Sequence, residues 1–324
     1  MALPAAKSLR HLKPVLKGAL TWIPGVQRAF YDAHAAGGTG EVQYCYGVWM
    51  KHLALLWRAG MQEIPAMVAE MGPGKSLGCG LAALLSGAER YGALDKVRHA
   101  SAATTVPLLE PMRALFSSRA PRPAKGWPDY DDMLDERLFP GRILTDERLS
   151  RSLAAPRLVE LGDAARKLDQ KKQHRRLRYG TWHDAAKVVL AGEADLVFSH
   201  AVLSFVEDQE AFYECCARWL KPGGWMSHQI DFTTLGVTNE WNGHLQYGEA
   251  VWRIIAGQRP FFVNRERLSH HLALMQKYGF EVKSVQRFAR QDGIQRSALA
   301  PRWREISEDD LTCASAFIVA QKAP

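Results

Sequence analysis

The chain has 324 residues, of which 47% are hydrophobic and 23% charged, and its formal net charge is +8 at pH 7. This length allows one large domain with additions or two modest ones, and the apolar content excludes a globally disordered chain. The longest strongly apolar stretch, residues 196–206, contains His200 and two serines and is too short to cross a bilayer.

Cysteine usage and the N-terminus bear on the cellular compartment. The five cysteines are an odd number without the spacing of a zinc site, and no apolar segment near the N-terminus leads to a cleavage site. We therefore expect a reducing, cytoplasmic setting. The positive charge raises nucleic acid or an anionic membrane as partners, and residues 1–32 and 166–178 carry much of it. The second run lacks aromatic residues that would stack on bases, so we expect a solvated helix face and no nucleic-acid partner.

Residues 1–62 are predicted to form an N-terminal helical segment. Apolar residues recur at spacings of three and four and share one helix face, and Pro14 should kink or restart this helix. Together with Trp22 and several lysines, that face suits either docking on the chain's own domain, which we expect, or peripheral contact of residues 1–32 with an anionic membrane. The residues of the face are Leu9, Leu12, Leu16, Leu20 and Ile23.

From Ile64 the pattern alternates between strands and helices. "IPAMVAEMG" is a short apolar strand, "LGCGLAALLSGA" a helix of small residues, and "RYGALD" a second strand that ends at Asp95. Residues 101–176 then interrupt the alternation with much proline and charge. So long a connection is seldom idle, and we expect a helical insertion that covers an active site.

The alternation resumes after the insertion. "LRYGTW" and "ADLVFSHAVL" are strands, "DQEAFYECCARWL" is a helix, and "KPGG" should turn the chain before the strand "WMSHQID". A helical block over residues 245–278 and the strands "FEVKSVQRF" and "TCASAFIVAQK" complete the chain. The order predicts an α/β fold with an open, doubly wound sheet over residues 63–324.

The stretch "EMGPGKSLG", Glu70 to Gly78, follows the first strand and allows three ligands. A nucleotide-triphosphate loop requires G-x-x-x-x-G-K-[ST], but Ala69 stands where its first glycine belongs. A dinucleotide fingerprint requires G-x-G-x-x-G, but Leu77 takes the place of its third glycine. The first interpretation is weak, and the second stays open with an incomplete fingerprint.

S-adenosylmethionine suits the neighbouring residues better. Glu70 can bind the amino group of the cofactor or order the loop, and Gly72 and Gly74 let the chain turn tightly past a ligand. Asp95 can accept hydrogen bonds from both ribose hydroxyls, and Asp184 from the adenine amino group. These features occur in the order that the fold requires. The candidate cofactor-binding residues are Glu70, Gly72, Pro73, Gly74, Asp95, His183, Asp184 and Ser199.

Residues 64–322 resemble a class I S-adenosylmethionine-dependent methyltransferase. "EMGPGKSLG" is similar to the family motif E-x-G-x-G-x-G, with Ser76 in place of the third glycine, and "WHDAA", "ADLVFSHAVLSFVED" and "LKPGG" resemble later family segments. The resemblance implies a Rossmann-like sheet of seven strands, mostly parallel with the last antiparallel. "CYGVWMKHL", "SHQIDF" and "FFVNRERLS" are similar to methyltransferases found among bacterial surface-polysaccharide genes, which implies a sugar hydroxyl as the acceptor.

Methyl transfer to a hydroxyl requires collinear positioning and benefits from a base. The candidate catalytic residues are His200 at the end of the fourth strand, Asp231 at the end of the fifth, and His228, whose commoner role would be a buried structural one. Asn242 and His244 follow the fifth strand and could contact an acceptor, although Asn242 could also cap a helix. No pattern demands a metal. The alternatives are an RNA methyltransferase, whose D/N-P-P-Y signature is absent, and a binding protein without turnover.

Overall fold

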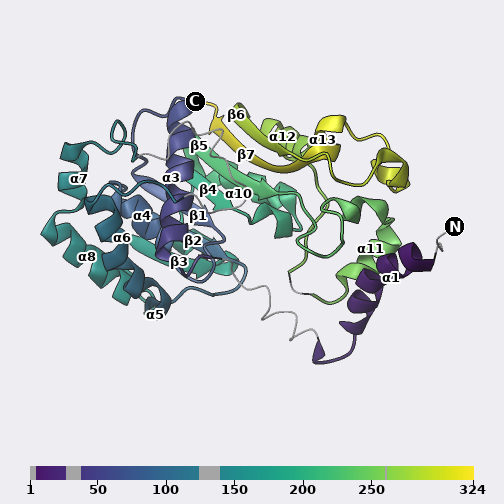
Figure 1. Ribbon diagram of the computed structural model, residues 1–324. Helices are drawn as coiled ribbons and strands as arrows, with labels where there is room; N and C mark the ends of the chain where they lie inside the picture. The colour runs from purple at the N-terminus through teal and green to yellow at the C-terminus, as the bar shows by residue number, and fades with distance from the viewer. Residues whose placement is uncertain (1–4, 27–37, 124–138, 260) are drawn as a thin grey trace.

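The computed structural model describes residues 5–26, 38–123, 139–259 and 261–324, with the side chains described from residue 12 onward (Figure 1). Its centre is a seven-stranded sheet in the order β3-β2-β1-β4-β5-β7-β6. Neighbours from β3 to β5 pair in parallel, and β7 is antiparallel to both β5 and β6. This confirms the predicted fold class. The strands are β1 (Met67–Met71), β2 (Arg90–Asp95), β3 (Leu177–Thr181), β4 (Ala194–His200), β5 (Leu220–Asp231), β6 (Phe280–Ala289) and β7 (Cys313–Lys322).

Helices cover both faces of the sheet (Figure 1). On one face, Trp49 and Leu53 of α3 share a core with Leu84 of α4 and Phe198 of β4, and α6, α7 and α8 extend this layer. On the other face, α10 and α12 pack on the sheet. The described helices are α1 (Ala5–Leu20), α3 (Val42–Arg58), α4 (Gly78–Leu85), α5 (Ala102–Thr105), α6 (Leu109–Ser117), α7 (Asp146–Ser152), α8 (Ala155–Arg166), α9 (Ala185–Val188), α10 (Gln209–Trp219), α11 (Glu249–Ala256), α12 (Leu268–Lys277) and α13 (Glu308–Thr312).

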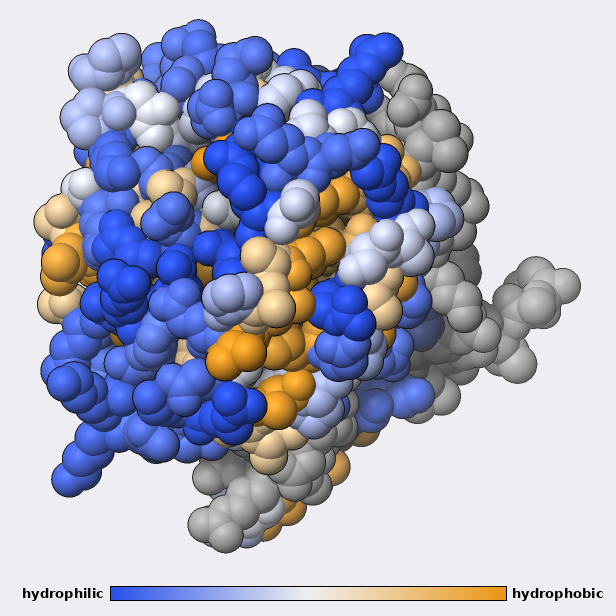
Figure 2. Space-filling model, turned by 90° about the vertical axis from the view of Figure 1, so that its left-hand side faces the viewer, coloured by the Kyte–Doolittle hydropathy of each residue, from blue (hydrophilic) through white to orange (hydrophobic). Residues whose placement is uncertain are grey.

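The insertion between β2 and β3 is helical, as predicted. Its helices α5 to α8 pack beside α3 and α4, and the hydroxyl of Thr105 accepts a hydrogen bond from the backbone N–H of Leu77 at 3.2 Å. The predicted covering of an active site falls in part on residues 124–138, which lie outside the described residues. The surface on the α7 and α8 side is largely hydrophilic, with an apolar area among the polar residues (Figure 2).

Several local predictions differ from the structure. "KPGG" lies within β5, because the strand begins at Leu220. Gly223 has a left-handed backbone (φ +72°) at the point where the pairing register with β4 shifts. The basic run 166–178 is not a helix face, because α8 ends at Arg166 and the chain continues in turns. There the carboxylate of Glu160 pairs with Arg176 at 2.6 Å.

The N-terminal helix docks on α11, as expected, but not through its leucine face (Figure 1). The helix is continuous through Pro14. Its buried face carries small side chains and packs tightly on α11, because a Cβ on Gly18 would lie 2.1 Å from the carbonyl oxygen of Ile254. The hydroxyl of Thr21 accepts from the backbone N–H of Gln258 at 2.8 Å. Leu12, Leu16 and Leu20 are exposed instead. Within the described ranges, no helix combines the length and apolar character needed to span a membrane.

Candidate functional site

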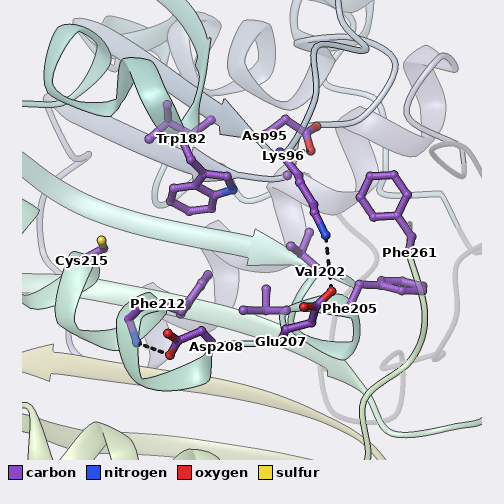
Figure 3. A pocket seen from close by; sticks show the side chains of 14 residues that line it. Asp95, Lys96, Trp182, Val202, Phe205, Glu207, Asp208, Phe212, Cys215 and Phe261 are labelled. Carbon is purple, nitrogen blue, oxygen red and sulfur yellow. Dashed lines mark hydrogen bonds and ion pairs between the residues drawn. The ribbon is translucent and has the colours of Figure 1, made fainter. Parts of the chain in front are cut away.

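A cleft of about 420 Å³ lies at the carboxyl ends of β1 to β4, beside the point where the strand order reverses (Figure 3). Open α/β sheets bind ligands at this position, and the volume falls within the usual range for small-molecule sites. Its walls are mostly apolar, with a few acidic and basic side chains. The lining residues are Gly72, Leu94, Asp95, Lys96, Trp182, Val202, Phe205, Val206, Glu207, Asp208, Ala211, Phe212, Cys215 and Phe261.

Asp95, the candidate ribose-binding acid, ends β2 and lines the cleft. Its Oδ2 accepts from the backbone N–H of Gly74 at 3.3 Å, and its Oδ1 from the backbone N–H of Lys96 at 2.9 Å. Burial raises the pKa of Asp95 above its ordinary value. The carboxylate thus connects the glycine loop to the end of β2 and has further lone pairs for ligand hydroxyls.

The glycine loop has the backbone conformation that its glycines allow. Gly72 (φ +77°) and Gly74 (φ +74°) are left-handed, Pro73 between them is buried, and Lys75 faces solvent. A Cβ on Gly72 would lie 2.4 Å from Cγ2 of Val202, so the loop packs directly on the segment after β4. No side chain larger than hydrogen fits at position 72 without displacing Val202.

Ser76, which replaces the third glycine of the family motif, has a structural role of its own. Its hydroxyl donates to the backbone carbonyl of Thr39 and accepts from the backbone N–H of Gly78 at 3.1 Å. The hydroxyl of Thr39 in turn accepts from the backbone N–H of Lys75 at 2.8 Å. The turn before α3 therefore holds the glycine loop from outside the sheet.

Glu70 lies behind the loop and not among the residues that line the cleft. Its carboxyl is buried and accepts a hydrogen bond from the hydroxyl of Tyr91. Burial raises the pKa of Glu70 well above its ordinary value, which favours the neutral form. Of the two roles predicted for Glu70, ordering the loop fits this position, whereas a neutral carboxyl is a poor partner for a charged amino group.

The segment after β3 contributes Trp182 to the cleft, one residue before the predicted His183. The indole of Trp182 stacks on that of Trp219, with ring centroids 6.0 Å apart and planes 8° from parallel. Asp184 turns aside, because it accepts from the ammonium of Lys187 at 2.9 Å and from the hydroxyl of Thr181 at 3.3 Å. Neither His183 nor Asp184 lines the cleft.

Ser199 and His228 lie inside the layer between the sheet and α10. The hydroxyl of Ser199 and Nδ1 of His228 are 2.8 Å apart, and both side chains are completely buried. The ring of His228 packs edge-on against Phe212 and Tyr213. The structure therefore brings neither the predicted cofactor contact at Ser199 nor the catalytic candidate His228 to the cleft, because strand alternation points both into this core.

His200 lies on the opposite face of the sheet, toward α3, and belongs to a chain of polar contacts. Its Nδ1 is 3.3 Å from Nε2 of His52, whose Nδ1 is 2.8 Å from the hydroxyl of Ser227. The ring of Tyr44 stands edge-on to His200, 6.2 Å between centroids. Burial and the nearby charge of Lys51 lower the pKa of His200 to about 3, so its imidazole is neutral at physiological pH. Sequence reasoning missed His52, although it lies within the predicted N-terminal helical segment, in α3.

Asp231 ends β5 and is almost fully buried. Its Oδ1 accepts from the backbone N–H of Thr233 at 2.7 Å, and its backbone carbonyl accepts from the hydroxyl of Ser204 at 2.6 Å. Burial lowers the pKa of Arg267 to about 10, and the nearby charge of Asp231 acts against this decrease. These contacts make Asp231 an anchor for the turn after β5. Neither Asp231 nor His200 is among the residues that line the cleft.

Asn242 and His244 stabilise the C-terminal part of the chain. Oδ1 of Asn242 accepts from the backbone N–H of Ile294 at 2.7 Å, and its amide donates to the carbonyl of Leu311 at 3.3 Å. The imidazole of His244 is buried beside Trp252. The predicted acceptor contacts are not seen, because both side chains are directed into the protein. No cluster of three His, Cys, Asp or Glu residues suited to a metal occurs in the described ranges.

Comparison with known proteins agrees with this architecture. Residues 153–227 match a family model described as "Methyltransferase domain", which spans less than a quarter of the chain and leaves the glycine loop outside. No curated protein matches the chain.

Solved structures of low similarity include three methyltransferases. One, an S-adenosylmethionine-dependent enzyme from Mesorhizobium loti, has 14% identity and a TM-score of 0.38, over 82% of this chain and 95% of the other. A second, from Listeria monocytogenes, has 13% identity and a TM-score of 0.41, over 88% of this chain and 100% of the other. The phosphoethanolamine N-methyltransferase 2 of Haemonchus contortus has 15% identity and a TM-score of 0.42, over 85% of this chain and 53% of the other. Similarities this low assign no activity. The matched domain, with the strand order and the cleft, supports a methyltransferase that depends on S-adenosylmethionine as its cofactor.

Proposed function

We propose that the chain binds S-adenosylmethionine in the cleft and methylates a hydroxyl oxygen of a small acceptor, with a sugar as the expected class. The observation that carries this proposal is Asp95, whose carboxylate stands between the glycine loop and an apolar cleft. A carboxylate at the end of β2 suits ribose hydroxyls, and the apolar walls suit a flat heterocycle. A dinucleotide would also require an anion-binding helix start, and the incomplete fingerprint disfavours it.

The walls of the cleft support an adenosine-sized ligand. Trp182 and Phe212 supply aromatic surface, and the ammonium of Lys96 lies 3.4 Å from the carboxylate of Glu207 on the other side (Figure 3). Because this ion pair is exposed, its contribution to stability is small and ligand entry can break it at little cost. Phe261 adds an aromatic ring beside Lys96 from the segment before α12.

For the transfer itself, we assign the base to His200. When bound, the cofactor supplies a methyl group on a positively charged sulfur, which retains the bonding electrons. The acceptor oxygen forms the new bond to carbon, and its proton passes to Nε2 of His200. A neutral imidazole can accept it, and a weak base suffices because a hydroxyl becomes far more acidic as its oxygen is alkylated.

His52 is the positioning residue in this proposal. If Nδ1–H of His200 donates to Nε2 of His52, and Nδ1–H of His52 donates to the hydroxyl of Ser227, then Nε2 of His200 carries a free lone pair. The same contacts stabilise His200 once it has taken up a proton.

Cofactor binding is tested by titration calorimetry with S-adenosylmethionine, S-adenosylhomocysteine, NAD and ATP. We expect the first two to bind, and Asp95→Asn to weaken S-adenosylhomocysteine binding by roughly tenfold or more, which corresponds to about 1.4 kcal/mol. Asp184→Asn is the matched control, because Asp184 also follows a strand but lies outside the cleft. Binding of NAD or ATP alone would overturn the proposal.

The acceptor is tested by transfer of labelled methyl groups to glycans and to RNA extracted from cells that lack the gene. Label in the glycan fraction supports the sugar acceptor, whereas label in RNA would replace it with the RNA alternative. With the acceptor in hand, His200→Gln should lower kcat by about a hundredfold and leave S-adenosylhomocysteine affinity unchanged. His270→Gln, on the surface of α12, is the control.

A further inference from the structure

The surface formed by α1, the turn after it and α11 is unusually apolar. Of the ten large hydrophobic side chains that are most exposed in the described ranges, seven lie here. Three are leucines of α1, with 48%, 63% and 50% of their surface exposed. The seven are Leu12, Leu16, Leu20, Trp22, Ile23, Val251 and Ile254, and together they are named the α1–α11 surface below.

The helix packing explains why these leucines face outward. Leu12, Leu16 and Leu20 are four residues apart and form one stripe, whereas Pro14, Gly18 and Thr21 form the buried stripe on the opposite side. The buried stripe fits α11 closely: a Cβ on Gly257 would lie 2.0 Å from the hydroxyl of Thr21 and 2.5 Å from the carbonyl oxygen of Gly18. Because the small residues fill this contact, the leucines have no place in the protein's own core.

Basic side chains border the leucine stripe of α1. Lys13 and Lys17 lie next to the leucine stripe, and neither has a carboxylate partner among the described residues. Arg253 is exposed on α11. The first 31 residues of the chain contain no Asp or Glu. Both lysines also border a cavity of about 520 Å³, whose lining includes one acid, Glu240.

We propose that the α1–α11 surface rests on an anionic lipid bilayer. An apolar stripe bordered by lysines, with a tryptophan at its end, matches an interfacial helix, whose apolar side chains enter the boundary of the acyl chains while the cations reach the headgroups. A second copy of the chain would instead place lysines against lysines, because α1 offers no carboxylate to pair with them. Exposed apolar patches on soluble proteins usually mark an interaction site.

Vesicle sedimentation of the full chain tests this proposal. We expect binding to vesicles of phosphatidylcholine with phosphatidylglycerol, much weaker binding to phosphatidylcholine alone, and a decrease at high salt. The double variant Leu16→Glu/Leu20→Glu should weaken binding by roughly tenfold or more, because two carboxylates would face the headgroups. Val159→Glu is the matched control: Val159 is 69% exposed on α8, at the opposite end of the molecule (Figure 1).

Two further measurements keep the result decisive. The thermal midpoint and S-adenosylhomocysteine affinity of the double variant should equal those of the parent, which separates the surface from the fold and from the proposed function. Lys13→Gln/Lys17→Gln should reduce binding to anionic vesicles and its salt dependence. Equal binding by parent and double variant, or no binding to anionic vesicles, would overturn the proposal. So would a dimer in sedimentation equilibrium that Leu16→Glu/Leu20→Glu converts to a monomer.

Discussion

At the scale of single residues, Glu70 leads to a prediction about pH. Burial raises the pKa of Glu70 above its ordinary value of 4.5, so the folded state holds this proton more tightly than the unfolded state. The contribution of Glu70 to the free energy of unfolding must therefore fall as pH rises from 4.5 toward the folded-state pKa. Glu70→Gln removes this titration but keeps an oxygen that can accept from Tyr91.

The free energies of unfolding of the parent chain and Glu70→Gln are compared by urea unfolding between about pH 5 and pH 8. We expect the stability of the variant relative to the parent to rise with pH. A constant difference over that range would mean that Glu70 is ionised in the folded protein.

Gly72 gives a second prediction at this scale. Gly72→Ala places a methyl group against Val202 and strains a left-handed backbone, which costs about 1–2 kcal/mol for the backbone alone. Because both residues line the cleft, S-adenosylhomocysteine binding should fall by more than the thermal stability does. Val202→Ala in the same chain removes the clash and should restore part of the affinity. If the second substitution restores nothing, the contact does not shape the cleft.

Individual site residues were predictable only where the chain order decides their position. Asp95 ends a strand and reaches the cleft, as its place in the sequence indicates. After β3, however, a single turn decides which of Trp182, His183 and Asp184 lines the cleft, and the contact with Lys187 draws Asp184 away. His52 meets His200 across 148 residues, and no local pattern reports such a contact.

At the scale of elements, the strands were predicted well because buried parallel strands are short, apolar and bounded by turn residues. Helix faces were harder. The leucine spacing of α1 identified a helix and an apolar stripe, but the choice of docking face depended on the fit of Gly18 against the backbone of α11. Side-chain size at the contact outweighed hydrophobicity, which periodicity alone does not show.

This leads to a paired prediction for α1. Leu16→Ala should change the free energy of unfolding by less than about 0.5 kcal/mol, although burying a leucine usually contributes several times more. Gly18→Leu should detach α1 from α11, because its Cβ would overlap the backbone of residues 254 and 255. Limited proteolysis near residue 20 reports the detachment. Equal protection of the two variants would contradict the packing described above.

At the scale of the whole molecule, buried neutral histidines predict sensitivity to acid. Burial lowers the pKa of His200, His228 and His271 to about 3, against 6.5 for the free side chain. The unfolded chain therefore binds more protons below pH 6.5, and stability is lost as pH falls from 6.5 toward 3. Each of these histidines contributes a slope of about 1.4 kcal/mol per pH unit in that window.

Glu70 and Asp95, whose pKa values burial raises, act in the opposite direction. The histidines outnumber them, because burial also lowers the pKa of His52 and His244. We expect the urea midpoint to decrease clearly between about pH 7 and pH 5. His271→Gln, which can keep a hydrogen bond to the hydroxyl of Tyr213, should make the decrease shallower. A midpoint that does not change with pH would show that these histidines reach solvent.

The serine at position 76 makes the glycine loop dependent on a distant part of the chain. Its hydroxyl and the N–H of Lys75 are satisfied by Thr39, which belongs to the turn before α3 and not to the strand and helix that flank the loop. The loop is thus not a portable module: grafted into a related sheet without residues 38–41, it would lose both partners. Conversely, with glycine at position 76 the loop would no longer depend on this side-chain contact with Thr39, and the sequence before α3 could change independently of the loop. The serine therefore couples the sequences of the two segments.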